Sequence, residues 1–157
     1  MDVTRLMHDL VNDLATSISG EFCVRLEEND ELKEITEKAH HFPYQNKGQF
    51  DNSKKFEFLY EAKGLRTFLR VEPYWLQEFD NVWMIDDLLE EFKTLRVLSL
   101  PSVRIKELPD SIDNLKHLRY LNISYTRINH LPDSLCNLYY LQTLILSRYI
   151  TKLPKNE

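Results

Sequence analysis

Three adjacent residues near the start of the chain, Met7, His8 and Asp9, carry side chains that could do chemistry. A histidine N–H donates a hydrogen bond to an anionic oxygen, and more strongly when the ring is protonated. The triplet also falls within a helical pattern, because leucines recur at every fourth residue from Leu6 to Leu14. From the residues alone, the pair of His8 and Asp9 is best interpreted as an ordinary part of a helix.

Two other groups of titratable residues could suggest a site. His40 and His41 are adjacent, so in an extended strand they point to opposite faces and cannot chelate one ion together. The acidic residues of "VWMIDDLLEEF" are better explained as the solvated face of a helix, because no histidine or cysteine completes a metal site nearby. These acidic residues are Asp86, Asp87, Glu90 and Glu91.

The sequence contains no recognisable catalytic motif. It has neither a G-x-x-x-x-G-K-[ST] phosphate loop nor a G-x-S-x-G nucleophile turn. Cys23 and Cys136 lie far apart and fit no ligand spacing, so we expect buried free thiols. We therefore expect no enzyme activity, no metal site and no cofactor bound by these residues alone.

Composition narrows the class of protein. The 157 residues, 43% hydrophobic and 29% charged, suffice for one globular domain or a piece of a larger protein. A net charge of −5 provides no basic field for nucleic acid or anionic lipid. No apolar run is long enough to span a membrane, and charged residues interrupt the first segment where a leader peptide needs an apolar core. We expect an intracellular, cytoplasmic protein.

A repeat of 23 residues begins at Leu95 and again at Leu118, and an incomplete unit follows at Leu141. The two full units read "LRVLSLPSVRIKELPDSIDNLKH" and "LRYLNISYTRINHLPDSLCNLYY". In each unit "LxxLxL" predicts a short strand with inward leucines, and the later spacing of three and four predicts a helical or 3₁₀ return. Pro109 and Pro132 suit the first turn of these returns. Each coil exposes an apolar face that only the next coil covers, which predicts a solenoid with parallel strands.

Less regular coils precede this repeat. "GLRTFLRV" predicts a strand in which Leu65 and Phe68 face inward, with Arg70 at the third inward position. Residues 38–44 are expected to form an earlier strand, and residues 82–92 a helix with one apolar face. That apolar face comprises Ile85, Leu88, Leu89 and Phe92.

The repeat resembles the leucine-rich repeat, and "LPxSIxxLxxL" is similar to its intracellular plant type. The resemblance implies an α/β solenoid with short parallel strands and irregular, 3₁₀ or short-helical returns. The asparagine usual in the buried turn of this family is replaced here by Val103, Thr126 and Tyr149. The backbone groups of these turns therefore need other partners, which a threonine can supply and a valine cannot.

The order of motifs along the chain resembles plant disease-resistance proteins of the nucleotide-binding, leucine-rich-repeat family, coiled-coil class. The motifs that carry this resemblance are "MHDLVNDLA", "GEFCVRLE", "KFEFLYEAKGLRTFL" and "LRVLSLPSVRIKELPDSI". The resemblance implies that residues 1–25 are an α-helical remnant of the winged-helix subdomain that ends the nucleotide-binding (NB-ARC) module. Residues 26–94 would then be irregular repeats or a capping region, and residues 95–157 regular repeats.

The resemblance also implies a role for the opening triplet. In that family a Met-His-Asp motif lies at the end of the winged-helix subdomain, where its histidine approaches the diphosphate of bound ADP. The motif maps onto Met7, His8 and Asp9, so His8 is the expected contact to the ADP phosphate. ADP or ATP with Mg²⁺ is implied for full-length members, and none is expected here because the phosphate loop is missing.

We therefore expect a fragment of an intracellular plant immune receptor that is switched by nucleotide in defence signalling. The implied partners are the receptor's own NB-ARC and coiled-coil domains, and a pathogen effector or a host protein that the receptor guards. A free-standing repeat adaptor is the alternative, and an in-frame phosphate loop upstream would separate the two. A nucleotide hydrolase is disfavoured by the missing loop.

The concave strand face is the expected partner surface, because residues between and just beyond the strand leucines point outward. Tyr120 is the preferred anchor, since a tyrosine combines a large apolar area with a polar tip. The last unit is expected to be an open edge, because Leu141, Leu144 and Leu146 lack a covering neighbour on one side. The outward residues are Val97, Ser99, Tyr120, Asn122, Thr143 and Ile145.

Overall fold

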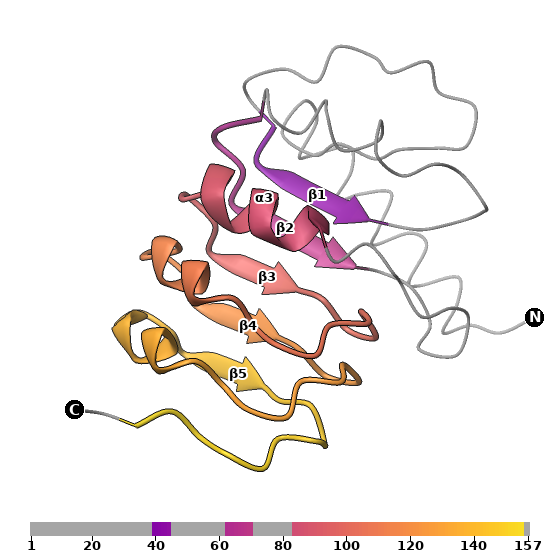
Figure 1. The fold of residues 1–157 in the computed structure, drawn as a ribbon. Helices are drawn as coiled ribbons and strands as arrows, with labels where there is room; N and C mark the ends of the chain where they lie inside the picture. The colour runs from indigo at the N-terminus through magenta and orange to yellow at the C-terminus, as the bar shows by residue number, and fades with distance from the viewer. Residues whose placement is uncertain (1–38, 45–61, 71–82, 156–157) are drawn as a thin grey trace, which may run out of the picture.

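Five short parallel strands, one from each coil, form a single sheet in the order β1-β2-β3-β4-β5 (Figure 1). The computed structural model describes residues 39–44, 62–70 and 83–155. The strands are β1 (His41–Tyr44), β2 (Thr67–Arg70), β3 (Val97–Ser99), β4 (Tyr120–Asn122) and β5 (Thr143–Ile145). Because sequence neighbours are also sheet neighbours, each coil contacts the coils before and after it, as the repeat predicts.

One buried row runs through the centre of the strands. Phe42 pairs in register with Phe68, Phe68 with Leu98, and Leu98 with Leu121. These four side chains are at most 1% exposed, and the two phenylalanine ring centroids lie 5.6 Å apart. Leu144 continues the row on β5 but is only half-buried. The inward positions predicted for Phe68 and for the leucines of β3 and β4 are confirmed.

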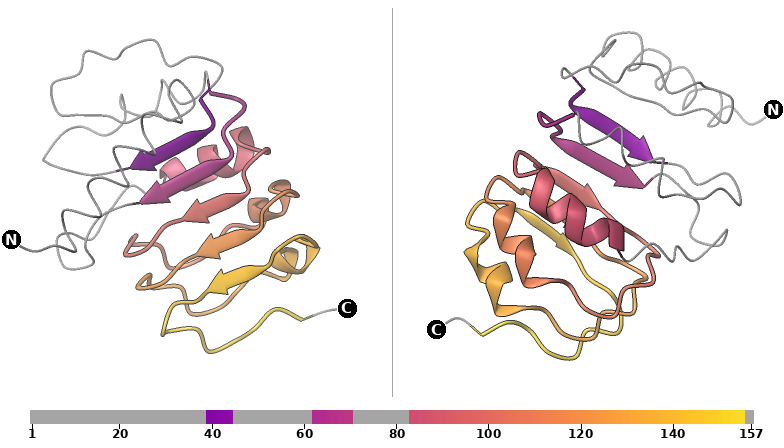
Figure 2. Two further views of the ribbon diagram at one scale, coloured as in Figure 1. Left: turned by 180° about the vertical axis from the view of Figure 1, so that it is seen from behind. Right: turned by 45° about the horizontal axis from the view of Figure 1, so that its top comes forward.

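Helical returns cover one face of the sheet (Figure 2). They are the α-helix α3 (Trp83–Glu91) and two 3₁₀ helices, η3 (Asp110–Asn114) and η4 (Asp133–Asn137). Each is anchored by apolar side chains that face the sheet, in agreement with the spacing of three and four. The anchors are Ile85, Leu88, Leu89 and Phe92 in or next to α3, Ile112 in η3 and Leu135 in η4.

The prolines of the Leu-Pro steps lie one residue earlier than predicted. Pro109 and Pro132 are the N-cap residues of η3 and η4, with extended backbone at φ −62° and −69°. Their carbonyl oxygens accept from Ile112 N at 3.1 Å and from Leu135 N at 3.1 Å, which begins each 3₁₀ helix. A proline suits this position because its fixed φ fits and its missing N–H has no helical partner.

The buried turns after β3 and β4 differ in the side chains that form hydrogen bonds with their backbone. The Thr126 hydroxyl donates to the carbonyl oxygen of Ile123 at 2.7 Å, and the Ser147 hydroxyl of the next coil donates to the carbonyl oxygen of Thr126 at 2.6 Å. Val103, at the equivalent position one coil earlier, is buried and offers no such donor. The prediction that threonine supplies a partner is confirmed.

Each of these turns also contains a residue with left-handed backbone, Ser102 at φ 61° and Tyr125 at φ 58°. The two residues are 23 positions apart, so this conformation belongs to the coil geometry.

Arg70 occupies the third inward position of its coil, where leucine or isoleucine stands in the later coils. The side chain is 8% exposed, and its Nη1 donates to the carbonyl oxygen of Pro101 at 2.6 Å. The coil is irregular, as predicted, but the charged group gains a backbone acceptor from the following coil. That bond offsets part of the cost of placing a guanidinium in the core.

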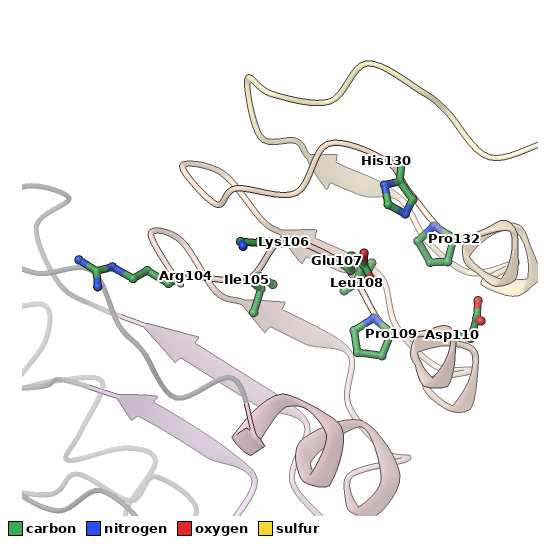
Figure 3. Close-up of a pocket in the computed structure, with 9 residues that line it drawn as sticks. All are labelled: Arg104, Ile105, Lys106, Glu107, Leu108, Pro109, Asp110, His130 and Pro132. Carbon is green, nitrogen blue, oxygen red and sulfur yellow. The ribbon is translucent and has the colours of Figure 1, made fainter.

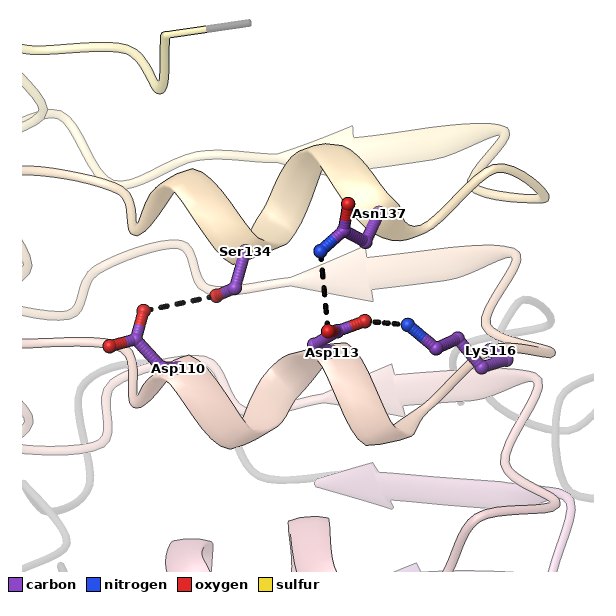
Figure 4. Close-up of polar contacts among 5 residues, drawn as sticks. All are labelled: Asp110, Asp113, Lys116, Ser134 and Asn137. Atoms are coloured by element: carbon purple, nitrogen blue, oxygen red, sulfur yellow. Dashed lines mark hydrogen bonds and ion pairs between the residues drawn. The ribbon is translucent and has the colours of Figure 1, made fainter. Parts of the chain in front are cut away.

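A polar ladder joins η3 to η4 on the outside of the returns (Figure 4). The Ser134 hydroxyl donates to Asp110 at 3.2 Å, and the Asn137 side-chain amide donates to Asp113 at 3.2 Å. Asp113 also pairs with Lys116 in its own coil. Asp110 of the first Leu-Pro-Asp-Ser step and Asp113, three residues later, therefore link η3 to η4.

Several sequence-based predictions fall on residues that the structure does not describe. They include the helix of the opening stretch, the whole of residues 1–25, most of residues 26–94 and Cys23. Cys136 is described and is a free thiol, but it is half-buried in η4 and not fully buried as predicted. It stands one residue after the inward Leu135, so the return turns it partly away from the core.

Candidate functional site

The face of the sheet opposite the helical returns is the candidate site, and we call it the strand face. Among the described elements, no helix or strand lies over it (Figure 2). Two rows of outward side chains cross it, because strand residues alternate between the two faces and the strands are in register. The first row contains Thr67, Val97, Tyr120 and Thr143. The second row contains Leu69, Ser99, Asn122 and Ile145.

Most of the residues predicted to contact a partner are exposed or half-buried on the strand face. Thr143 and Ile145 on β5 are exposed, and Tyr120 and Asn122 on β4 are half-buried. The structure therefore places these four side chains together on adjacent strands. Val97 joins them as the half-buried neighbour of Tyr120.

Ser99 departs from the prediction that it is an outward contact residue. Its residue surface is only 5% exposed, because a short side chain lies between Leu69 and Asn122 in the row. The Asn122 side-chain amide donates to the Ser99 hydroxyl at 3.3 Å, while its oxygen accepts from the backbone N–H of Ser124 at 2.9 Å. Ser99 thus helps to fix the orientation of Asn122 and offers little surface to a partner.

Sequence reasoning missed Leu69, which is 36% exposed on β2 beside Ser99. The register would have identified it, because Leu69 alternates with the inward Phe68 and Arg70. With Tyr120 and Ile145 it supplies apolar area on the strand face, next to the polar groups of Asn122 and Thr143. Such a mixture suits recognition of another protein surface.

Two of the titratable groups singled out from the sequence, the acidic residues of α3 and the pair of His40 and His41, lie in the described part of the chain. The four acidic residues of α3 are exposed on the side of the helix away from the core, as predicted for a solvated face. The rings of His40 and His41 are perpendicular, with centroids 6.4 Å apart. Among the described residues, no three His, Cys, Asp or Glu side chains are grouped to hold a metal ion. Met7, His8 and Asp9 lie outside the described residues.

The pKa of His41 is lowered from its ordinary value. Partial burial is the largest cause, and the positive charges of His40 and Arg66 add to it. His41 begins β1 and pairs in register with Thr67, the residue that follows Arg66.

A groove of about 690 Å³ follows the segment that returns from the end of β3 to the start of η3 (Figure 3). It is lined by residues 104–110 together with His130 and Pro132. The lining mixes acidic, basic and apolar side chains. The Nδ1 atom of His130 lies 2.6 Å from the Asn129 side-chain oxygen. The groove combines no set of groups suited to a defined reaction.

No helix within the described ranges is both long and apolar enough to cross a bilayer.

Stacked coils with parallel strands, 3₁₀ returns and an open strand face define a leucine-rich repeat protein. The chain belongs to the leucine-rich repeat region family, whose model matches residues 76–156. An internalin from Listeria monocytogenes has the same fold, with a TM-score of 0.50 and 15% identity over 77% of this chain and 36% of that one.

The chain is also homologous to plant disease resistance proteins. It is 42% identical over 116 residues to the putative disease resistance protein At3g14460 of Arabidopsis thaliana, which covers 71% of this chain and 8% of that protein. It is 38% identical over 109 residues to the putative disease resistance RPP13-like protein 1 of the same plant, covering 66% of this chain and 10% of that protein. The chain thus spans about a tenth of the length of these relatives.

Proposed function

We propose that the repeats are the recognition and autoinhibition module of an intracellular plant immune receptor. The observation that supports this most directly is the strand face, where Tyr120 and Ile145 offer apolar area beside the polar Asn122 and Thr143. The homology to disease resistance proteins supports the defence context. The proposed partners are a pathogen effector or a guarded host protein, and the receptor's own NB-ARC and coiled-coil domains.

We also propose that the receptor is switched by ADP and ATP, with Mg²⁺ bound alongside the nucleotide. In this proposal His8 contacts the ADP phosphate, and Met7 and Asp9 complete its motif. The basis is the sequence motif together with the homology of the chain. The repeats would hold the receptor in its ADP state until a partner binds the strand face.

Alanine substitution on the strand face in the full-length receptor tests the recognition proposal. Tyr120→Ala and Ile145→Ala are expected to abolish pathogen-dependent cell death or to cause cell death without the pathogen. Tyr125→Asn is the control, because it removes an exposed tyrosine beyond the end of β4 and asparagine tolerates the left-handed backbone there. If recognition and autoinhibition both survive every change on the strand face, this surface is not the recognition site.

A further inference from the structure

Three coils carry the same four-residue pattern just before or at the start of their strands, and the repeat analysis does not require it. The pattern is Lys-x-Leu-Arg, at residues 63–66, 93–96 and 116–119. The leucine of each copy is fully buried, and the lysine and arginine are exposed. The leucine therefore anchors the coil, while the two basic side chains are directed to solvent. We call these six basic residues the basic ridge: Lys63, Arg66, Lys93, Arg96, Lys116 and Arg119.

Backbone hydrogen bonds align the three copies. Arg96 N donates to the carbonyl oxygen of Arg66 at 2.8 Å, and Arg119 N donates to that of Arg96 at 2.8 Å. Adjacent strands lie about 4.8 Å apart, so the three arginines form a row with like charges as nearest neighbours. The row lies at the amino-terminal ends of β2, β3 and β4, because each arginine directly precedes the first residue of its strand.

The fold itself does not need this row of charge. Like charges on neighbouring strands oppose the pairing of those strands. The next coil places Tyr139 and Gln142 at the equivalent positions, and β5 still pairs with β4 in register. Within the described part of the chain, Lys116 is the one member of the ridge that forms a salt bridge, with Asp113. The remaining positive charge is therefore available to a partner.

The surroundings of the basic ridge indicate the chemistry of that partner. The ridge ends at Tyr139 and Tyr140, which are 83% and 62% exposed and offer amphipathic contact area. Exposed carboxylates gather on α3, on the helical side of the molecule. The lowered pKa of His41, to which His40 and Arg66 contribute after burial, is consistent with a positive potential at the first coils.

We propose that the basic ridge binds an acidic segment of a partner protein that lies along the strand face. The proposal rests on the proposed role of the strand face in recognition and adds the partner's charge. A protein segment is favoured over nucleic acid because the chain carries a net charge of −5, which repels a long polyanion as a whole. A short carboxylate-rich segment contacts the ridge while avoiding the acidic helical side.

A fluorescein-labelled decaglutamate peptide tests the proposal with the full chain by fluorescence anisotropy. We expect saturable binding at about 50 mM salt that weakens strongly by about 300 mM, because the contacts are exposed ion pairs. The triple variant Arg66→Glu, Arg96→Glu, Arg119→Glu is expected to lower the affinity at least about tenfold. Changing the same three arginines to glutamine is expected to lower the affinity less. This variant replaces the glutamate variant in the test if the latter loses its native circular dichroism spectrum.

The matched control changes three other arginines to glutamate, Arg104, Arg127 and Arg148. They are exposed, one in each coil, and follow the carboxyl ends of β3, β4 and β5. Figure 3 shows Arg104 beyond the carboxyl end of its strand. The control changes the net charge equally and is expected to keep most of the affinity. Equal losses in both triple variants, no binding by the native chain at low salt, or tighter binding of a single-stranded decanucleotide would each overturn the proposal. Strand-face recognition is judged separately by the cell-death assay, so the two failures are distinguishable.

Discussion

The guanidinium of Arg70 donates to the carbonyl oxygen of Pro101, 31 residues later in the sequence, across 2.6 Å in the interior of the repeats. The bond connects the irregular second coil to the first regular one. It explains how a charged residue is accommodated at a position where later coils bury an aliphatic side chain.

Replacing Arg70 with methionine is expected to lower the free energy of unfolding by about 1–3 kcal/mol, because the apolar stem remains but the charged donor is lost. Chemical denaturation followed by circular dichroism measures this change. Arg66→Met in the same coil is the control, since Arg66 is exposed, and its effect should stay within about 0.5 kcal/mol. Equal effects of the two substitutions would show that the bond to Pro101 adds nothing.

Thr126→Val is expected to destabilise the chain by about 1 kcal/mol, because it keeps the shape of the buried side chain and deletes the donor to Ile123. Thr143→Val on β5 removes an exposed hydroxyl and is expected to be neutral or slightly stabilising. Thermal unfolding of both variants provides the comparison. A neutral Thr126→Val would mean that the turn needs no side-chain donor, as at Val103.

Arg66→Gln is expected to raise the pKa of His41. The substitution removes a positive neighbour that disfavours the protonated ring, while the larger contribution from burial is unchanged. Because the folded-state pKa of His41 is depressed, the unfolded chain takes up the proton first. Stability therefore begins to decline as the pH falls below about 6.5, the unfolded value, and declines until the folded-state pKa is passed. Titration of the ring protons by NMR reports the pKa, and a value unchanged by the substitution would contradict the positive potential at this edge.

In the polypeptide of residues 1–157, amides of residues 144–153 are expected to exchange with solvent well before those of residues 98–108. Strand β5 pairs with β4 alone in the described sheet, and Leu144 and Leu146 are only half-buried. Stability in stacked repeats is roughly a sum of neighbour contacts, so opening begins where neighbours are fewest. Hydrogen exchange measured by NMR or mass spectrometry tests this order. Equal or reversed protection would show that the last coil is stabilised by other contacts.

Calorimetric titration of the same polypeptide with ADP or with ATP and Mg²⁺ is expected to give no binding heat. One histidine donor at His8 does not replace a loop of backbone N–H groups, a lysine and a metal-binding hydroxyl. A micromolar site that His8→Ala abolishes would contradict this expectation.

The sequence alone predicted the architecture, because burial of a periodic set of leucines leaves few alternatives. Spacings of two at Leu98 and Leu100, and of three and four from Leu108 to Leu118, specify a strand followed by a 3₁₀ or helical return. Repetition after 23 residues specifies the stacking. The outward side chains Tyr120, Asn122, Thr143 and Ile145 followed from alternation along each strand.

The tertiary structure decided what depends on contacts between coils. Ser99 alternates outward like its neighbours, yet the flanking side chains cover it, and the half-burial of Cys136 likewise depends on how η4 is turned. How the core accommodates Arg70 depends on Pro101, which is far away in sequence and comes within hydrogen-bonding distance only in the folded chain. The Lys-x-Leu-Arg pattern is visible in the sequence, but it becomes a continuous row of charge only because parallel pairing places Arg66, Arg96 and Arg119 on neighbouring strands. Periodic burial is a local property of the chain, whereas these exposures and charge alignments are set by side chains that meet only after the coils stack.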